Sequence, residues 1–388
     1  MEFSIPAKLS HDGERFQEFL DEHLVPNLAV WYQNGMIPRS FLARMGKGGW
    51  FGFKMKDSLF KKLPALREAI IFERLAKISP GVAVAVLAHN DLGLVGLWLF
   101  GSEEVKQKYA ALAARGKTLL CLGNTESVAG SDVAGISMTA KQVKGGWVLN
   151  GTKAYITNGS MSDVAVITAV SDPRAKRNIR LSMFLVDLGS EGVKRTKLHK
   201  QGWIPSDLTR IQFTDVFVPE DHLMGERGRG LQQVLTIFTY SRVPITALTL
   251  GTAVGAFEMA LVHAKDRKIF GRKIAEFQNK AFDIADFYAR IEAVRLVLWK
   301  ACWAIDRGRD FRLESSMAKY LAVIIAREVT AWAADLFGAA SIIFEHPIHK
   351  FPMDAWAVSL GEGTQDVQKL IIFREVMKRY GDMTGGRI

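Results

Sequence analysis

The chain has 388 residues, 48% of them hydrophobic and 23% charged, with a formal net charge of +11. This composition excludes a disordered protein, and the length predicts two or three domains. The two cysteines, Cys121 and Cys302, provide no disulfide framework, and no Cys/His cluster has metal-ligand spacing. We therefore expect a cytoplasmic protein without a metal site.

The positive charge predicts attraction to anions without naming one. Nucleic acid, an anionic membrane face, phosphate-bearing cofactors and an acidic carrier protein all suit a basic surface. The basic residues are spread along the chain, however, and no recognition motif interleaves them with aromatic residues. The longest apolar stretch, Gly81 to Leu87, meets His89, Asn90 and Asp91 before it could cross a bilayer. We expect neither a nucleic-acid partner nor a membrane span.

The spacing of apolar residues divides the chain into three parts. In residues 1–118 they recur at intervals of three and four, as in Ile71, Leu75 and Ile78, which predicts a helical domain. In residues 119–225 they form short β-rich runs separated by Asn-Gly and Gly-Gly turns, which predicts an all-β domain. Helical spacing returns in residues 226–388. The chain is thus an α+β multidomain protein.

A glutamate stands between two glycines near the C-terminus. Gly361-Glu362-Gly363 precedes Thr364, a suitable N-cap for the amphipathic run that follows. Because glycine lets the backbone approach a ligand closely, Glu362 is free to point into a cavity. Taken alone, the pattern also suits a solvated glutamate in a turn.

Two upstream segments, residues 121–132 and 149–159, also combine ligand-binding features. Small and hydroxyl residues in the first could leave backbone N–H groups free for an anion. In the second, Tyr155 and Thr157 are two apart on a predicted strand, so they present a ring and a hydroxyl on one face. This pairing suits a flat ring with polar edges, although each half alone also suits an ordinary turn or strand. No strand leads into GxGxxG, and no Gly-Lys-Ser/Thr phosphate loop occurs.

Together these segments resemble the acyl-CoA dehydrogenases, flavoproteins that introduce a double bond between Cα and Cβ of an acyl thioester. The family pattern T-E-x-x-A-G-S-D, then L-N-G-x-K-x-aromatic-I-T-N-G, appears from Thr125 to Gly159, and its closing E-G-T appears at Glu362. Residues 89–109, 213–230 and 267–278 match further segments in the family's order. The resemblance implies an N-terminal helical domain, a β-barrel-like middle domain and a C-terminal four-helix bundle.

The resemblance also implies site residues. It places at the FAD cofactor Leu122, Asn124, Thr125, Gly130, Ser131, Tyr155, Ile156, Thr157, Arg267, Phe270, Gln278, Asp335, Gly338, Thr364 and Asp366. It places at the substrate Ser131, Thr239, Arg242, Gly363 and Arg374. In the family, the positions of Arg267 and Phe270 reach the FAD of a neighbouring subunit, which implies an oligomer, usually a homotetramer built as a dimer of dimers.

The resemblance implies that Glu362 removes the α-proton while hydride passes from Cβ to flavin N5. Burial against flavin and substrate can raise the pKa of such a carboxylate toward the working pH. Some relatives carry the base on a helix of the third domain, but the corresponding segment, residues 238–242, has no carboxylate. Glu362 is therefore the candidate base. The expected substrate is an acyl-CoA, and the expected electron acceptor is an electron-transferring flavoprotein or another acceptor.

Two alternatives remain open on the sequence. A carrier-protein phosphopantetheine arm could deliver an acyl or aminoacyl group, since a basic surface suits an acidic partner. The chain could also be a non-redox acyl-binding or scaffold subunit, because Asp335 stands where relatives have Gln, and an acid near a pyrophosphate is repulsive unless paired. Gly361 further replaces an aromatic residue that often precedes the catalytic Glu.

Overall fold

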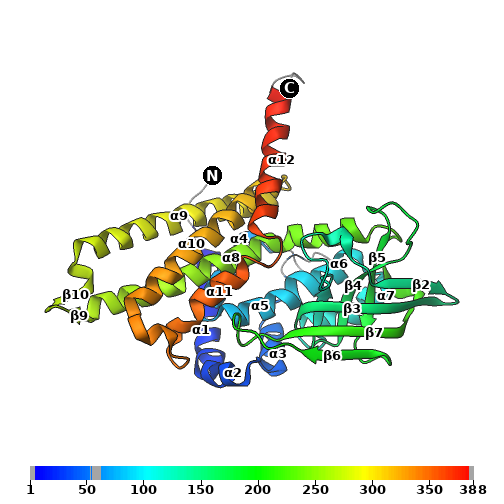
Figure 1. Ribbon diagram of the computed structural model, residues 1–388, viewed down its shortest axis with the longest axis horizontal. Helices are drawn as coiled ribbons and strands as arrows, with labels where there is room; N and C mark the ends of the chain where they lie inside the picture. Colours follow the sequence, from blue (N-terminus) through cyan, green and yellow to red (C-terminus); the bar gives the residue numbers. More distant parts are fainter. Residues whose placement is uncertain (1–4, 53, 55–62, 384–388) are drawn as a thin grey trace.

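The computed structural model describes residues 5–52, 54 and 63–383. Figure 1 shows an elongated molecule with a sheet at one end, helices at the other, and the last helix projecting from the middle. The N-terminal helices in the described residues are α1 (Ala7–His23), α2 (Leu28–Asn34), α3 (Arg39–Lys47), α4 (Ala65–Ile78), α5 (Pro80–Leu87), α6 (Val95–Phe100) and α7 (Glu103–Ala114). Local capping begins some of them: Ser102 Oγ accepts a hydrogen bond from Val105 N at the start of α7.

The helix that contains the apolar stretch Gly81 to Leu87 continues past His89. A π-helical segment, Ala88–Leu94, continues α5 into α6, and His89, Asn90 and Asp91 are buried within it. The helical run Pro80–Phe100 and α8 (Gly230–Asp266) are long and apolar enough to span a bilayer. Their apolar windows are 83% and 78% buried inside the protein, as in the core helices of soluble proteins.

The middle part is an eight-stranded sheet that is largely antiparallel. Its strands are β1 (Leu120–Gly123), β2 (Thr139–Val143), β3 (Gly146–Thr157), β4 (Val164–Val170), β5 (Leu181–Asp187), β6 (Val193–Lys197), β7 (Leu208–Pro219) and β8 (Leu223–Met224). The strand order is β6-β7-β3-β2-β4-β5-β8, with β1 parallel to β4. Its inner face forms a core of its own, in which the rings of Trp147 and Phe184 lie 5.3 Å apart.

The C-terminal part is a bundle arranged around the long helix α8. The other helices are α9 (Gln278–Asp306), α10 (Arg312–Phe337), α11 (Lys350–Val358) and α12 (Gln365–Met383), and a short hairpin of β9 (Lys268–Ile269) and β10 (Arg272–Lys273) joins α8 to α9. Helix α8 packs closely on α4 because Gly251 and Gly255 lack side chains. A Cβ at either glycine would lie 2.3 Å from a carbonyl oxygen of α4, that of Glu73 or Lys77.

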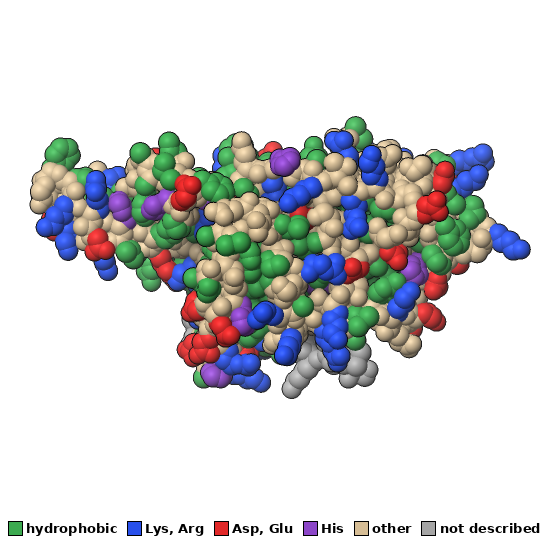
Figure 2. All heavy atoms as spheres, turned by 90° about the horizontal axis from the view of Figure 1, so that it is seen from below, with side chains coloured by type: hydrophobic (Ala, Val, Ile, Leu, Met, Phe, Trp, Pro, Cys, Tyr) green, Lys and Arg blue, Asp and Glu red, His purple; other side chains and the backbone are tan. Residues whose placement is uncertain are grey.

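The helical parts share one hydrophobic core, which also reaches strands of the sheet, for example at Val166 of β4 and Leu185 of β5. Lys and Arg side chains are scattered over the face seen in Figure 2 and are interspersed with Asp and Glu. This distribution agrees with the spread of basic residues along the sequence.

Candidate active site

The turn between α11 and α12, residues 361–363, carries Glu362 in the left-handed backbone region. Glu362 has φ +52° and Gly363 has φ +87°. A non-glycine residue in this region costs on the order of 1 kcal/mol or more, so surrounding structure must impose it. Lys319 Nζ, from α10, donates hydrogen bonds to the carbonyl oxygens of Gly361, Glu362 and Gly363 at 2.5, 2.9 and 2.8 Å. A side chain of another helix therefore holds the Glu362 turn.

The carboxylate of Glu362 contacts α8. Ser241 Oγ donates a hydrogen bond to Glu362 Oε2 at 2.5 Å. Burial raises the pKa of Glu362 to about 7, and Asp91 adds to this effect, while Lys319, Ser241 and Arg242 act in the opposite direction. A carboxyl group with a pKa near neutrality can accept a proton and release it again at the same working pH.

Two buried cations face this carboxylate. Arg242 Nη1 donates to Ser315 Oγ at 3.5 Å, while Arg242 Nε has no hydrogen-bond partner among the described residues. Burial lowers the pKa of Arg242 to about 10 and that of Lys319 to about 7. A buried guanidinium with an unused donor is suited to bind a polar or anionic group of a ligand.

Gly361 brings the sheet domain to the Glu362 turn. A Cβ at Gly361 would lie 3.3 Å from Cη2 of Trp203, in the loop between β6 and β7. Trp203 N also donates a hydrogen bond to Asp354 of α11. The indole ring of Trp203 therefore fills the space that an aromatic side chain at position 361 would need.

A second group of the residues that the resemblance assigns to the cofactor lies on β3. The register between β3 and β7 shifts between Lys153 and Ile156, and Tyr155 there has φ +58°. Such bulges re-aim side chains beside binding sites. The side chains still alternate, because Ile156 is buried in the sheet core while Tyr155 is 58% exposed and Thr157 is partly exposed. Only the backbone of Ile156 is therefore available to a ligand.

The segment from Leu122 to Ser131 is anchored to β3 by the side chain of Lys153. Lys153 Nζ donates to Asn124 O at 3.0 Å and to the carboxylate of Glu126 at 2.9 Å. Burial opposes ionisation of Glu126, but Lys153 and hydrogen bonds from Ser137 and Met138 outweigh it and lower the pKa of Glu126. The ion pair between Lys153 and Glu126 therefore connects the two motif segments, residues 121–132 and 149–159.

Burial decreases along the anchored segment from Leu122 to Ser131. Asn124 is buried, and its Oδ1 accepts a hydrogen bond from Thr168 Oγ1 at 2.7 Å. Leu122 is also buried and Thr125 is partly exposed. Gly130 and Ser131 are exposed, and a Cβ at Gly130 would meet no atom within 4 Å. The small residues therefore leave room for a ligand.

A third group lies at the opposite end of the molecule from β3 (Figure 1). Phe270, at the tip of the β9–β10 hairpin, has φ +51° and is 95% exposed. Its neighbours Arg267 and Arg272 are exposed cations, and Gln278 starts α9. The end of α10 lies nearby, because the rings of His263 and Phe337 stack 4.2 Å apart. Asp335 and Gly338, both exposed, belong to that end. Within a single chain, this third group therefore lies far from Tyr155 (Figure 1).

The remaining predicted residues are not gathered around the carboxylate of Glu362. Thr239 Oγ1 donates to Leu235 O within α8 at 2.8 Å. Thr364 joins the Glu362 turn to α12, where its carbonyl oxygen accepts from Gln368 N at 3.1 Å. Asp366 is exposed and pairs with Lys369 of its own helix at 3.2 Å. Arg374 is exposed farther along α12, which projects away from the molecule (Figure 1).

The structure adds three residues that sequence reasoning missed: Ser241, Lys319 and Trp203. Ser241 lies inside the segment that was searched only for a carboxylate. Lys319 could have been found as a lone lysine on an apolar helix face, since Ser315, Ala318 and Ala322 on the same face are fully buried. Trp203 gives no comparable signal, because its contact depends on how two domains meet.

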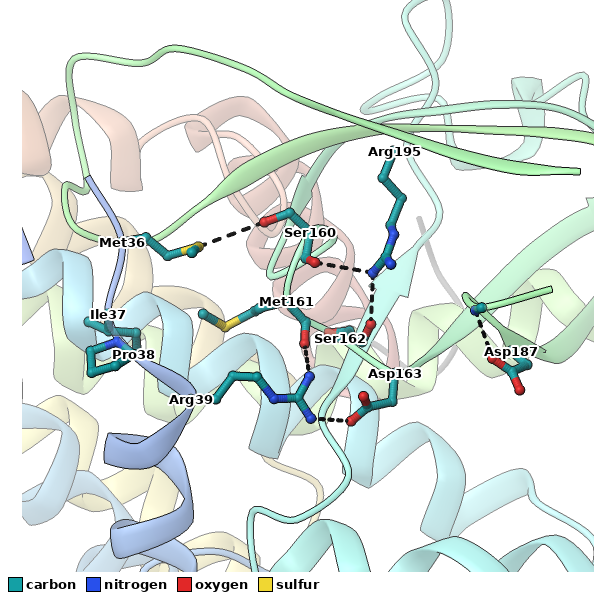
Figure 3. Close-up of a pocket in the computed structure, with 11 residues that line it drawn as sticks. Met36, Ile37, Pro38, Arg39, Ser160, Met161, Ser162, Asp163, Asp187 and Arg195 are labelled. Carbon is teal, nitrogen blue, oxygen red and sulfur yellow. Dashed lines mark hydrogen bonds and ion pairs between the residues drawn. The ribbon is translucent and has the colours of Figure 1, made fainter. Parts of the chain in front are cut away.

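A separate cavity of about 420 Å³ lies between the N-terminal helices and the sheet (Figure 3). Its two arginines are tied to the backbone: Arg39 Nη1 donates to Met161 O at 2.5 Å, and Arg195 Nη1 donates to Ser160 O and Ser162 O, both at 3.1 Å. Arg39, from α3, links the N-terminal helices to the sheet domain, whereas Arg195, from β6, binds backbone carbonyls within the sheet domain itself. Among the described residues, no cluster of His, Cys, Asp and Glu could hold a metal ion.

Comparisons with known proteins show which family the chain resembles along its length. The chain matches the acyl-CoA dehydrogenase N-terminal domain over residues 13–117, the middle domain over 121–216 and the C-terminal domain over 228–377. It is 34% identical over 349 residues to a subunit of the caffeyl-CoA reductase-Etf complex of Acetobacterium woodii, which covers 89% of this chain and 92% of that protein.

Two solved structures share the whole fold. Butyryl-CoA dehydrogenase from Megasphaera elsdenii has a TM-score of 0.93 and 27% identity over 97% of this chain and 100% of that one. The FAD complex of PigA has a TM-score of 0.92 and 28% identity over 98% of this chain and 100% of that one. The expected three-domain architecture is thereby confirmed.

Proposed function

Because the chain belongs to the acyl-CoA dehydrogenase family, whose members are FAD-dependent oxidoreductases, we propose that it oxidises the Cα–Cβ bond of an acyl thioester with Glu362 as the base. The observation that carries the proposal is the Glu362 carboxylate itself. Its pKa is near neutrality, and it lies against Ser241 and near two buried cations in a turn imposed by α10. A solvated glutamate in a flexible turn would show none of these features.

The residues on this chain fit FAD. Tyr155 presents an exposed aromatic ring at a bulge, and the Thr157 side chain two residues on is partly exposed. Gly130 and Ser131 leave open space beside exposed backbone. The hairpin offers the unburied ring of Phe270 between exposed cations, which suits the cofactor of a neighbouring subunit. When bound, FAD supplies two-electron oxidation by accepting the hydride that leaves Cβ.

The chain's own residues carry out the proton chemistry. Glu362 accepts the α-proton at a carboxylate oxygen, and its pKa of about 7 leaves much of it ionised at neutral pH. The Ser241 hydroxyl orients the carboxylate before substrate arrives. Arg242 is placed to contact polar atoms of the thioester, and the backbone N–H of Glu362 is proposed to stabilise charge on its carbonyl oxygen.

The assembly and its partners follow from the same proposal. We propose domains at residues 1–118, 119–225 and 226–388 and a homotetramer in which each hairpin completes a neighbour's FAD site. We propose an electron-transferring flavoprotein as the acceptor, supported by the relative that is named as a subunit of an Etf complex. The buried, free thiols of Cys121 and Cys302 agree with a reducing cytoplasm.

A carrier-protein thioester is the second candidate substrate. A structural relative is described with FAD and proline bound, at 28% identity and a TM-score of 0.92. An aminoacyl thioester is therefore a reasonable test compound for this chain. Matched acyl-CoA, acyl-carrier and prolyl-carrier thioesters, compared by kcat/KM, distinguish the two candidates.

The visible absorption of the purified protein tests the proposal. Anaerobic addition of a panel of thioesters should bleach the flavin spectrum of the wild type with at least one of them. Glu362→Gln should keep the flavin spectrum but slow bleaching by about two to four orders of magnitude, because a positioned base contributes that much. An unchanged bleaching rate in Glu362→Gln would contradict Glu362 as the base. A protein that binds no FAD after reconstitution would favour the non-redox alternative.

A further inference from the structure

Lys319 is fully buried within the first half of α10, and among the described residues its ammonium group makes no ion pair with a carboxylate. A lysine ammonium has three N–H donors. The three contacts to the carbonyl oxygens of Gly361, Glu362 and Gly363 use all of them, at 2.5, 2.9 and 2.8 Å. The whole donor capacity of this side chain is therefore directed at the backbone of one turn.

The three carbonyl groups belong to successive residues, and their oxygen atoms converge on one point. Extended and right-handed helical backbone do not turn three successive carbonyls toward a single donor, whereas here Glu362 and Gly363 both have positive φ. Glu362 has no conformational reason of its own to adopt φ +52°. Gln368 Nε2 gives additional support, because it donates to Gly363 O at 3.2 Å.

A buried ammonium is costly, and burial lowers the pKa of Lys319 to about 7, although the nearby Glu362 carboxylate acts in the opposite direction. A purely structural position on this apolar face would be filled better by an aliphatic residue. The neighbouring residues on the face, Ser315, Ala318 and Ala322, are small, so the long lysine reaches past them to the turn. Lys319 therefore packs less favourably than an aliphatic residue would, but its ammonium group holds the backbone that carries Glu362.

We propose that Lys319 is a positioning residue whose ammonium group holds the Glu362 turn in the left-handed shape that presents the carboxylate to Ser241 and the substrate. This inference rests on the proposed role of Glu362 as the base. It assigns to α10, a helix outside the sequence motifs of the site, the task of fixing the base. Removing Lys319 should leave FAD and thioester binding nearly intact and reduce the rate of proton removal.

The test compares FAD-loaded Lys319→Met with the wild type. Hydrogen–deuterium exchange of peptides covering residues 359–370 should become faster in the variant, while exchange in α8 and β3 stays unchanged. The value of kcat should fall about 10- to 100-fold with KM within a few-fold, because a misplacement of about 1 Å of a catalytic group has effects of this size. Flavin content per subunit should equal that of the wild type.

Lys350→Met is the matched control. Lys350 is also a buried lysine of the bundle, with its Nζ over the rings of Tyr32 and Phe351 at 5.5 and 5.0 Å. Its loss should lower the melting temperature without changing kcat or exchange in residues 359–370. If Lys319→Met does not accumulate as folded protein, Lys319→Gln, which lacks the charge and one donor, replaces it under the same criteria.

The two proposals fail separately. Wild-type exchange at the Glu362 turn and wild-type kcat in the Lys319 variant would overturn the positioning role, even if Glu362→Gln abolishes turnover. Conversely, full activity of Glu362→Gln would overturn the proposed base. In that case, faster exchange at the turn in the Lys319 variant would still show that Lys319 holds the backbone. It would not show that Lys319 positions a catalytic base.

Discussion

Ser241→Ala tests the electrostatic description of the base most directly. The substitution removes the hydroxyl that donates to Glu362 Oε2 at 2.5 Å and leaves Lys319 and Arg242 in place. A hydrogen bond to a charged acceptor contributes roughly 1.5–3 kcal/mol, and the lower end applies because Glu362 is partly exposed. About 1.4 kcal/mol changes an ionisation constant tenfold. Glu362 should therefore become a roughly tenfold weaker acid in the variant.

The expected pH dependence follows from the sign of this change. Glu362 must be ionised to accept a proton, so kcat/KM of the wild type should rise with pH through its pKa of about 7. Ser241→Ala raises that pKa further, which moves the acid limb of the profile to higher pH. The variant should lose about tenfold in kcat/KM well below pH 7 and little at pH 9 or above.

The assay is kcat/KM against pH with the best thioester, for the wild type, Ser241→Ala and two controls. Ser241→Thr keeps a hydroxyl and should follow the wild type. Thr249→Ala removes a buried hydroxyl from the same helix that bonds only to its own backbone, at Ile245 O, and should not move the acid limb. An acid limb that stays in place in Ser241→Ala, or moves to lower pH, would refute the reasoning.

Three further outcomes are expected. Gly363→Ala should lower kcat, and it should lower the unfolding free energy by about 1–3 kcal/mol, because φ +87° strains any residue other than glycine. Thermal unfolding measures this loss of stability. Lys153→Met leaves Glu126 buried without its cation, so it should cost about 3–5 kcal/mol of stability and reduce bound FAD, measured by denaturant unfolding and by absorbance. Phe270→Ala should change monomer stability by less than about 0.5 kcal/mol, since the ring is 95% exposed, but should weaken flavin retention and assembly in sedimentation.

The three-part architecture was predictable because each part has its own apolar period over many residues. Ile71, Leu75 and Ile78 lie on α4, and Ser182 to Val186 lie within β5, as their spacing predicts. The chain resembles its family over its whole length, and this resemblance supplied the candidate base. The burial of His89, Asn90 and Asp91 was not predictable, because their partners are not visible in the local sequence. One is the hydrogen bond from Gly52 N to Asn90 Oδ1.

The contacts that shape the candidate site were not predictable from local sequence. Ser241 meets Glu362 across 121 positions in the chain, and Lys319 meets Gly361 across 42. Both contacts depend on how α8 and α10 pack against the turn, which no periodicity encodes. Trp203 similarly reaches Gly361 from another domain. The residue type at such positions becomes meaningful only after the tertiary neighbours are known.

Helix α8 has 37 residues and thus spans about 55 Å, with Ser241 about a third of the way along it and the Phe270 hairpin just beyond its C-terminal end. If each hairpin completes a neighbour's site, defects in Glu362 and in Phe270 fall on different sites of a mixed oligomer. Co-assembly of Glu362→Gln chains with Phe270→Ala chains would then create sites with an intact base and an intact hairpin. Two impaired proteins would regain activity by intersubunit complementation, because the length of α8 keeps Glu362 and Phe270 of one chain in different sites.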